Sequence, residues 1–531
     1  MKSYDAIIIG AGHNGLICAA YLAKAGKSVL VLERRHLVGG ATVTEEIFPG
    51  FKYTVCSYVV SLLRPDIIEE LELPRHGFEL LPLNGTLTPT GDGDYVMRWH
   101  DAGDTRRELM RHSAKDAEAY ERFSELLYHL CLTVRPLLST PPVSPTSLSP
   151  ANLRDLKALG KKFGARTEHL YDLAKLMTMS AAEFVEQWFE TPALQGTLSA
   201  SGIIGTFLGP RSPGSAYVML HHYMGEIDGQ FRAWGFPRGG MGSVAEAIAS
   251  SAREHGVEIR CEAPVQKIII EKGQAKGVVL EGGEEIRAKT IVSSLDPKRT
   301  FQKLVEPEHL DKDFHKAINR FKIRGSSAKV NLSLDALPEF TCLDSLRERG
   351  ESTDPYMAGA ISISPSIDYL ERAYDDAKYG RFSRKPYMDM IIPTMIDPSM
   401  APPGKHVASL FVHYAPYELA DGAHWDDQRE ALGDAVIDVL AEHAPNIRDI
   451  ILHRQVVTPW DLEQTFGLTE GNIFHGELSL DQLFFLRPVP GSVGYGTPID
   501  NMYMCGSGTH PGGGVMGAPG QLAARAILGG K

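Results

Sequence analysis

The sequence predicts an α/β fold in which a Rossmann-like nucleotide-binding domain is assembled from separate segments and an α+β domain is inserted between them. A strand, a glycine turn, a helix and a second strand follow one another within residues 5–33. Strand patterns return near residues 257–293 and 502–505, after long helical stretches. At 531 residues, the chain has room for roughly two to four domains.

The first unit begins with residues 5–10 (DAIIIG), a short apolar run typical of a buried parallel strand. Residues 16–25 are rich in small apolar side chains and predict a helix, and residues 27–33 predict the next strand. Together these elements form one βαβ unit.

The middle of the chain has mainly helical patterns at residues 66–138 and 152–190, separated by a proline-rich stretch that predicts an exposed loop. Later segments have strand patterns, and the last strand enters a glycine-rich loop followed by a helix at residues 517–528. We assign to the nucleotide-binding domain residues 1–65, 230–300 and 485–531. We assign to the inserted substrate domain residues 66–229 and 301–484.

Composition argues against several classes of protein. Lys plus Arg is 54 and Asp plus Glu is 66, so the formal net charge of −12 does not suit nucleic-acid binding. The six cysteines form no C-x-x-C pair, and no metal-ligand cluster is visible, so we expect neither a redox disulfide nor a metal. No apolar run is long enough to span a membrane and no targeting segment is apparent, so we expect a cytoplasmic protein, or a mitochondrial matrix protein if the source is eukaryotic.

The first chemical motif is Gly10-x-Gly12-x-x-Gly15, which follows a strand and opens a helix. Gly10 permits the tight turn, Gly12 lets the backbone approach a pyrophosphate, and Gly15 allows the helix to pack closely on the strand. The start of this helix, with His13 and Asn14, presents unpaired N–H groups to that anion.

The second motif begins at the end of the second strand with Glu33-Arg34. Glu33 lies 18 residues after Gly15, where its carboxylate can accept hydrogen bonds from a ribose and would repel a 2′-phosphate. Gly39-Gly40 then adds another close backbone approach to the dinucleotide.

Two further glycine motifs occur later in the chain. Gly239 and Gly240 lie in FPRGGMG, directly before a predicted helix. Residues 505–517 (CGSGTHPGGGVMG) follow the last predicted strand and imply a backbone wrapped closely around a ligand. The residues in this loop that we expect to contact a cofactor are Gly506, Gly508, Val515, Met516 and Gly517.

With these motifs in this order, the sequence resembles the FAD-binding class that includes amine oxidases, phytoene desaturases and Rab GDP-dissociation inhibitors. Within that class it is similar to the phytoene desaturase and carotene ketolase superfamily. The tracts that carry this similarity are residues 61–79, 401–417, 471–488 and 505–520.

The resemblance implies a FAD-binding domain of the glutathione reductase type 2, amine oxidase-like kind. It places FAD in extended form, with the adenine near Val265, the ribose at Glu33 and the isoalloxazine near residues 508–517. In relatives the last glycine-rich segment lines the pyrophosphate and ribityl chain, and the helix near Gly517 points its positive end at the flavin.

The implied function is that of a FAD-dependent oxidoreductase. It would remove a hydride from an apolar, carotenoid- or lipid-like molecule, or from an amine-like one, and pass it to flavin N5, with oxygen or a quinone as the final acceptor. Candidate catalytic side chains near the flavin are His510, His475 and Glu477. No second complete βαβ fingerprint is visible, so we expect no dedicated nicotinamide site.

Three alternatives remain open within this class. The chain resembles a carotenoid desaturase or ketolase, an amine oxidase with an aromatic cage to which Tyr495 and Trp460 are candidates, or a non-enzymatic binding protein that acts through a protein partner. Glu33 and the intact last glycine loop count against the third. Homodimerisation and peripheral contact with an anionic membrane are further expectations.

Overall fold

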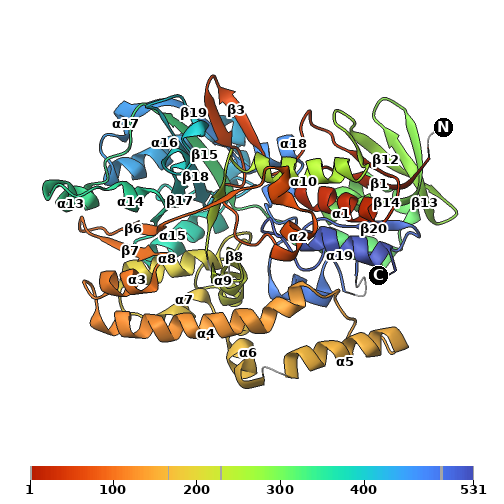
Figure 1. The fold of residues 1–531 in the computed structure, drawn as a ribbon, viewed down its shortest axis with the longest axis horizontal. Helices are drawn as coiled ribbons and strands as arrows, with labels where there is room; N and C mark the ends of the chain where they lie inside the picture. Colours follow the sequence, from red (N-terminus) through yellow and green to blue (C-terminus); the bar gives the residue numbers. More distant parts are fainter. Residues whose placement is uncertain (1–2, 165–166, 228–229, 232, 491–493, 530–531) are drawn as a thin grey trace.

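The computed structural model describes residues 3–164, 167–227, 230–231, 233–490 and 494–529. The molecule contains two large mixed sheets, which lie in opposite halves of the view in Figure 1. A layer of helices that includes α4 (Ala114–Leu138) and α5 (Pro150–Gly164) runs along one side of the molecule. This arrangement confirms the predicted α/β fold class.

The first sheet has the strand order β11-β2-β1-β14-β13-β12, and β20 pairs with the end of β14. Strands β11, β2, β1, β14 and β20 run parallel, whereas β12, β13 and β14 are antiparallel neighbours. The strands are β1 (Ser3–Ile9), β2 (Val29–Leu32), β11 (Glu258–Arg260), β12 (Val265–Glu271), β13 (Gln274–Leu280), β14 (Glu285–Ser293) and β20 (Met502–Met504).

Strand β1 is apolar because both of its faces are covered. Ala6 and Ile8 belong to a core shared with helices α1 (His13–Lys24), α10 (Gly242–Glu254) and α19 (Ala518–Ile527). Ile7 and Ile9 point to the opposite core, under β12 to β14. The predicted βαβ unit is therefore present, with the helix beginning three residues earlier than residue 16.

The second sheet has the order β19-β15-β18-β17-β16-β6-β7. Helix α16 (Trp425–His443) shares a core with one face of it. The strands are β6 (Gly85–Pro89), β7 (Tyr95–Trp99), β15 (Ser327–Leu334), β16 (Ala360–Ile363), β17 (Tyr387–Ile391), β18 (His406–His413) and β19 (Ile451–Val457). All eight residues of β15 are buried, although polar side chains alternate along it.

The helical prediction for residues 66–138 is wrong in part. Strand β5 (Leu80–Pro82) and strands β6 and β7 occupy residues 80–99, and helices return only at α3 (Ala102–Leu109) and α4. Strand β6 pairs in parallel with β16, more than 270 residues away, through Thr86–Ala360 and Leu87–Ile361. Such a pairing leaves no signal in the local pattern.

The other elements connect these layers. Small two-stranded sheets are formed by β3 (Thr44–Phe48) with β4 (Phe51–Thr54), by β10 (Gly235–Pro237) with β5, and by β8 (Glu226–Ile227) with β9 (Gln230–Phe231). The remaining helices are α2 (Pro65–Glu70), α6 (Leu170–Thr178), α7 (Ala181–Glu186), α8 (Pro192–Ser199), α9 (Ser215–Tyr223), α11 (Pro297–Lys303), α12 (Lys312–Arg320), α13 (Asp344–Glu348), α14 (Asp354–Met357), α15 (Ile367–Lys378), α17 (Ile447–Ile450) and α18 (Pro459–Phe466). Within the described ranges, no helix combines the length and apolarity needed to cross a membrane.

The contact between β1 and α1 is tight at Gly15. A Cβ at this position would lie 2.3 Å from the Gly10 carbonyl oxygen and 3.0 Å from Ser294. We expect Gly15→Ala to lower the free energy of unfolding by about 1–3 kcal/mol, because the backbone must shift to make room. Gly91→Ala is the control, since a Cβ at Gly91 meets nothing within 4 Å. Equal urea midpoints for the two variants would contradict this packing argument.

Candidate functional site

A cavity of about 350 Å³ lies at the carboxyl ends of β1 and β2. It collects segments that are far apart in the sequence, including the start of β12 and residues 466–468. The predicted cofactor residues that line it are Gly10, Gly12, His13, Asn14, Glu33, Arg34, Gly39, Gly40 and Val265.

The first two glycine motifs touch each other beside this cavity. Gly12 and Gly39 form a parallel β-bridge, and the Gly39 N–H donates to the Ala11 carbonyl at 2.9 Å. A Cβ on Gly40 would lie 3.3 Å from the Gly12 Cα. The backbones of the two glycine motifs are therefore in direct contact, with no Cβ at Gly12, Gly39 or Gly40 to separate them.

Glu33 holds these turns together while it faces the cavity. Its Oε2 accepts from the Ala11 N–H at 2.8 Å, and its Oε1 accepts from the Arg35 N–H at 2.9 Å. A carboxylate has about four acceptor sites, so hydroxyl groups of a ligand can still donate to it. Only 8% of the residue is exposed.

The start of α1 is open to an anion. Its N-cap is Gly12, which has no side chain to accept a hydrogen bond from the first helical N–H groups. Four basic side chains line the cavity against two carboxylates, Glu33 and Glu281. The basic ones are Arg34, Arg35, Arg299 and Lys303.

Buried polar atoms without partners are concentrated here. Among the described residues, fourteen buried side-chain nitrogen or oxygen atoms have no hydrogen-bond partner, and five of them belong to residues that line this cavity. Buried polar groups are nearly always paired, so these atoms fit a polar ligand. They are His13 Nε2, Asn14 Oδ1, Arg35 Nη1, Arg299 Nε and His475 Nδ1. A dinucleotide with an anionic pyrophosphate suits this lining.

A second cavity, of about 130 Å³, adjoins the first. The two share His13, Ala41, Ile473 and Ser507 in their walls. The wall of the second is mainly apolar and includes four aromatic residues, Tyr58, Trp234, Phe411 and Phe474; Tyr58 stacks on Phe411 with ring centroids 5.8 Å apart. The first cavity, with its charged lining, thus adjoins an apolar chamber.

One buried lysine lies in the wall of the apolar chamber. Lys329, on β15, is 2% exposed and has no ion-pair partner among the described residues. Its ammonium donates to the Thr54 carbonyl at 3.2 Å, to Asn331 Oδ1 at 3.3 Å and to Ser409 Oγ. Burial lowers the pKa of Lys329 to about 7.

The structure separates the three candidate catalytic residues. His475 lines the first cavity, and burial lowers its pKa to about 4. His510 lines neither cavity; its Nε2–H donates to the Leu137 carbonyl at 2.9 Å. Glu477 also lines neither cavity and pairs with Arg324 through bonds of 2.8 and 3.1 Å. His510 and Glu477 therefore have structural partners in place of a ligand.

Some residues of the later glycine motifs line a cavity and others do not. In the last loop, Val515 lines the second cavity together with Ser507 and Gly514, which sequence reasoning did not single out. Several predicted cofactor residues line neither cavity: Gly239, Gly240, Gly506, Gly508, Met516 and Gly517. Gly240 is instead a packing position, where a Cβ would lie 2.3 Å from Thr44 Oγ1.

The expected aromatic cage residues also lie elsewhere. Tyr495 donates its hydroxyl to the His510 carbonyl at 3.0 Å, and Trp460 packs against Tyr417. Neither lines the two cavities, whereas Tyr58 and Phe411 do line the second. The sequence contained little local signal for these two aromatics, since Tyr58 lies in the irregular segment after β4 and Phe411 lies on β18 of the second sheet.

A buried arginine connects the loop before the last strand to the last glycine loop. Arg487 is 0% exposed. Its guanidinium donates to the carbonyls of Phe474, Gly476, Glu477, Gln482 and Ser507 at 2.9–3.3 Å. It thereby fixes the segment whose residues 473–475 lie between the cavities.

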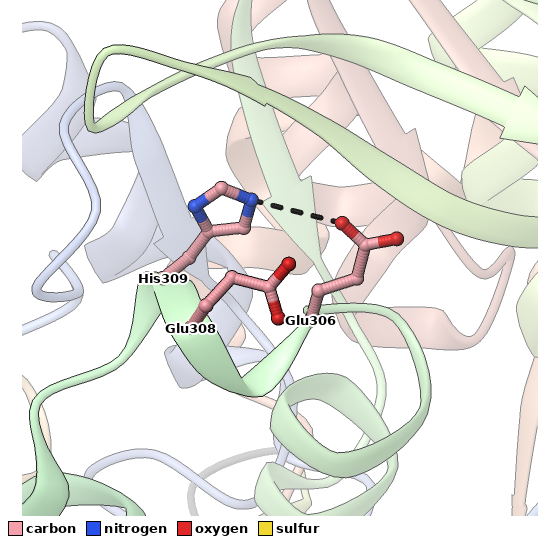
Figure 2. Close-up of side chains that lie close together, drawn as sticks. All are labelled: Glu306, Glu308 and His309. Carbon is pink, nitrogen blue, oxygen red and sulfur yellow. Dashed lines mark ion pairs between the residues drawn. The ribbon is translucent and has the colours of Figure 1, made fainter.

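One group in the described part of the chain has metal-ligand spacing, formed by Glu306, Glu308 and His309 (Figure 2). His309 Nε2 lies 3.8 Å from Glu306 Oε2, and Lys267 already pairs with Glu306. Both glutamates are exposed, and none of the three residues lines the two cavities. Acidic groups of this kind are common on surfaces, so we assign no function to it.

A FAD-binding fold with an apolar chamber beside its dinucleotide groove is the class that this geometry defines. The family model of flavin containing amine oxidoreductases matches residues 15–528, and the chain belongs to that family. It is thus a FAD-dependent oxidoreductase by family, which confirms the predicted cofactor.

Particular relatives agree with this assignment. Pyridine nucleotide-disulfide oxidoreductase domain-containing protein 2 from Rattus norvegicus is 40% identical over 99% of this chain and 93% of its own length. Prolycopene isomerase 1 from an Oncidium hybrid cultivar is 26% identical over 97% of this chain and 82% of its own length. These matches confirm the resemblance to the phytoene desaturase superfamily.

Solved structures support the same fold. Cyclohexylamine oxidase from Brevibacterium oxydans IH-35A superimposes with a TM-score of 0.58 at 18% identity, covering 99% of both chains.

The buried lysine predicts a pH-dependent stability. The folded-state pKa of Lys329 is about 7, below its ordinary value of 10.5, so the unfolded chain binds the proton more tightly between these values. The lysine therefore destabilises the fold at neutral pH, and this penalty disappears as the pH rises through that window. We expect Lys329→Met to be more stable than the wild type near pH 7, and the difference to shrink by up to about 1.4 kcal/mol per pH unit on the way to pH 10.

Free energies of unfolding from denaturant titrations across that range measure the effect. The exposed Lys267→Met is the matched control for loss of one positive charge. A difference between Lys329→Met and the wild type that stays constant with pH would contradict the buried-ammonium interpretation.

Proposed function

We propose that this protein oxidises an apolar or amine-like small molecule bound in the second cavity, with FAD held in the first. The observation that carries the proposal is that the two cavities share a wall, so that a group at the end of the polar groove faces the aromatic chamber. When bound, FAD supplies the acceptor for a hydride.

The residues of the first cavity suit the parts of the dinucleotide. Glu33 accepts the ribose hydroxyls, the open start of α1 and the glycine turns receive the pyrophosphate, and Val265 lies at the adenine end. His13 and Ser507 stand at the passage into the second cavity.

The second cavity binds the reacting part of the substrate. Tyr58 and Phe411 form a flat apolar wall, which orients an uncharged group and excludes water. Lys329 is partly neutral near pH 7 because of its lowered pKa, so it is able to accept a proton from a substrate amine or hydroxyl as the hydride leaves.

The ribose assignment is tested first. Glu33→Ala removes the acceptor of the ribose hydroxyls, and we expect FAD affinity to fall by about 10- to 100-fold, the value of a hydrogen bond to a charged group. Glu46→Ala, an exposed carboxylate in β3, is the control. Released FAD per chain and the dissociation constant for added FAD give the result; unchanged affinity in Glu33→Ala would contradict the assignment.

The reaction is tested by an anaerobic panel of secondary amines, apolar alcohols, polyenes and NADPH, followed by the flavin absorption band. We expect at least one of the first three classes to bleach the flavin, with a rate that rises through about pH 7 in the wild type and not in Lys329→Met. Bleaching by NADPH alone would contradict the proposal. A chain that binds no FAD at all would instead favour a non-enzymatic role through a protein partner.

A further inference from the structure

A third cavity, of about 120 Å³, adjoins the apolar chamber. The second and third cavities share His222 and Trp234 in their walls. Polar side chains dominate the third: Thr86, Arg98, His100, Tyr120, Ser201, His222 and Tyr223. A molecule that spans the second and third cavities would therefore have its far end in polar surroundings.

Arg98 is the charged group of this third cavity. It projects from β7, which lies beside α8 (Figure 1), and its Nη2 reaches Thr197 Oγ1 on α8 at only 3.4 Å. Its Nε is buried and has no hydrogen-bond partner. No carboxylate of the described residues lies within ion-pair distance of it.

A buried arginine with an unpaired guanidinium nitrogen and no ion pair is unusual, because burying a charge costs free energy unless hydrogen bonds satisfy it. Arg487 is also buried, but all three of its guanidinium nitrogens donate to backbone carbonyl oxygens. Arg98 lacks such a shell of carbonyl oxygens: its side-chain partners are Thr197 and Tyr120, and its Nε has no partner among the described residues, so part of the guanidinium is available to a ligand.

The other charged groups nearby do not compete for this role. Lys329 has used its three N–H donors on Thr54, Asn331 and Ser409. Asp389 contributes the one carboxylate in this region that influences Arg98, but it accepts the Tyr58 hydroxyl at 2.6 Å and forms no ion pair with Arg98 within the described structure. Burial raises the pKa of Asp389 to about 6.

His222 adds no positive charge at neutral pH, since burial lowers its pKa to about 4. Its Nδ1–H donates to the Val218 carbonyl at 2.8 Å. The charged groups considered around the second and third cavities are Arg98, Lys329 and Asp389. Their net charge is positive when Lys329 is protonated. A positive balance favours an anionic group of the substrate and repels a cationic one.

We propose that the third cavity binds a carboxylate of the substrate through the guanidinium of Arg98, while the uncharged reacting part of the same molecule fills the second cavity. This substrate class rests on the proposed function. The planar fork of arginine matches a carboxylate with two parallel hydrogen bonds, which a small polar chamber can enclose.

Thermal stabilisation of the FAD-loaded protein by hexanoate, hexanamide and hexylamine tests the proposal without turnover. These probes have the same apolar chain and differ in the charge of the end group. We expect hexanoate to bind at least about tenfold more tightly than hexanamide, and hexylamine to bind more weakly than both. Arg98→Met should remove the preference for hexanoate.

Arg106→Met is the matched control, because Arg106 is an exposed arginine on the adjacent helix α3. It should keep the preference. Arg98→Lys retains a charge without the fork, and we expect an intermediate affinity; it also serves if Arg98→Met fails to fold. Equal binding of hexanoate and hexanamide to the wild type, or a preference that survives both Arg98 variants, would overturn the proposal.

The binding test of Arg98 and the oxidation test of the proposed function give independent results. An Arg98-dependent preference for hexanoate supports this site even if no compound in the anaerobic panel bleaches the flavin. Conversely, bleaching by uncharged compounds with no Arg98-dependent preference would overturn the carboxylate site and leave the oxidoreductase proposal intact.

Discussion

The arrangement of the site depends on how one fully buried charge, the guanidinium of Arg487, is satisfied. Five backbone carbonyls from residues 474–507 surround it, and no carboxylate takes part. A buried guanidinium with missing acceptors would carry a large desolvation penalty, so the backbone must keep these carbonyls in place. The consequence is a fixed path for Phe474 and His475, which stand in the walls of the second and first cavities, and a fixed position for Ser507 at the passage between them.

The nucleotide-binding part of the fold was predictable because its determinants are local. A buried strand, a glycine turn and a helix must follow one another closely, and Gly10, Gly15 and Glu33 each have a role that only one residue type fills well. The second sheet was harder to predict because its pairings are remote. Strands β6 and β7 lie in a region that the sequence pattern predicted as helical; they form an antiparallel hairpin, and β6 joins the sheet through the remote strand β16.

The candidate site shows the same division. Nine of the predicted cofactor residues meet in one cavity; eight of them lie in the segments that directly follow β1 and β2, and the ninth, Val265, begins β12. Lys329 and Arg98 were missed, because a basic residue in an alternating strand ordinarily points to solvent. The run SAKVNLSL in β15 contained a signal, as its polar residues lie in a strand buried on both faces. His510 and Glu477 were candidates because their side-chain chemistry suits catalysis; in the structure His510 bonds the Leu137 carbonyl and Glu477 pairs with Arg324.

We propose that FAD in the first cavity has its reactive end at the apolar chamber that contains Lys329. A crystal structure of the protein purified with its bound cofactor would test this placement. We expect adenine beside Val265, the pyrophosphate at Gly12 and the flavin ring between Ser507, Val515 and the chamber with Tyr58 and Lys329. A flavin ring that points away from that chamber, or a groove filled by a different ligand, would contradict it.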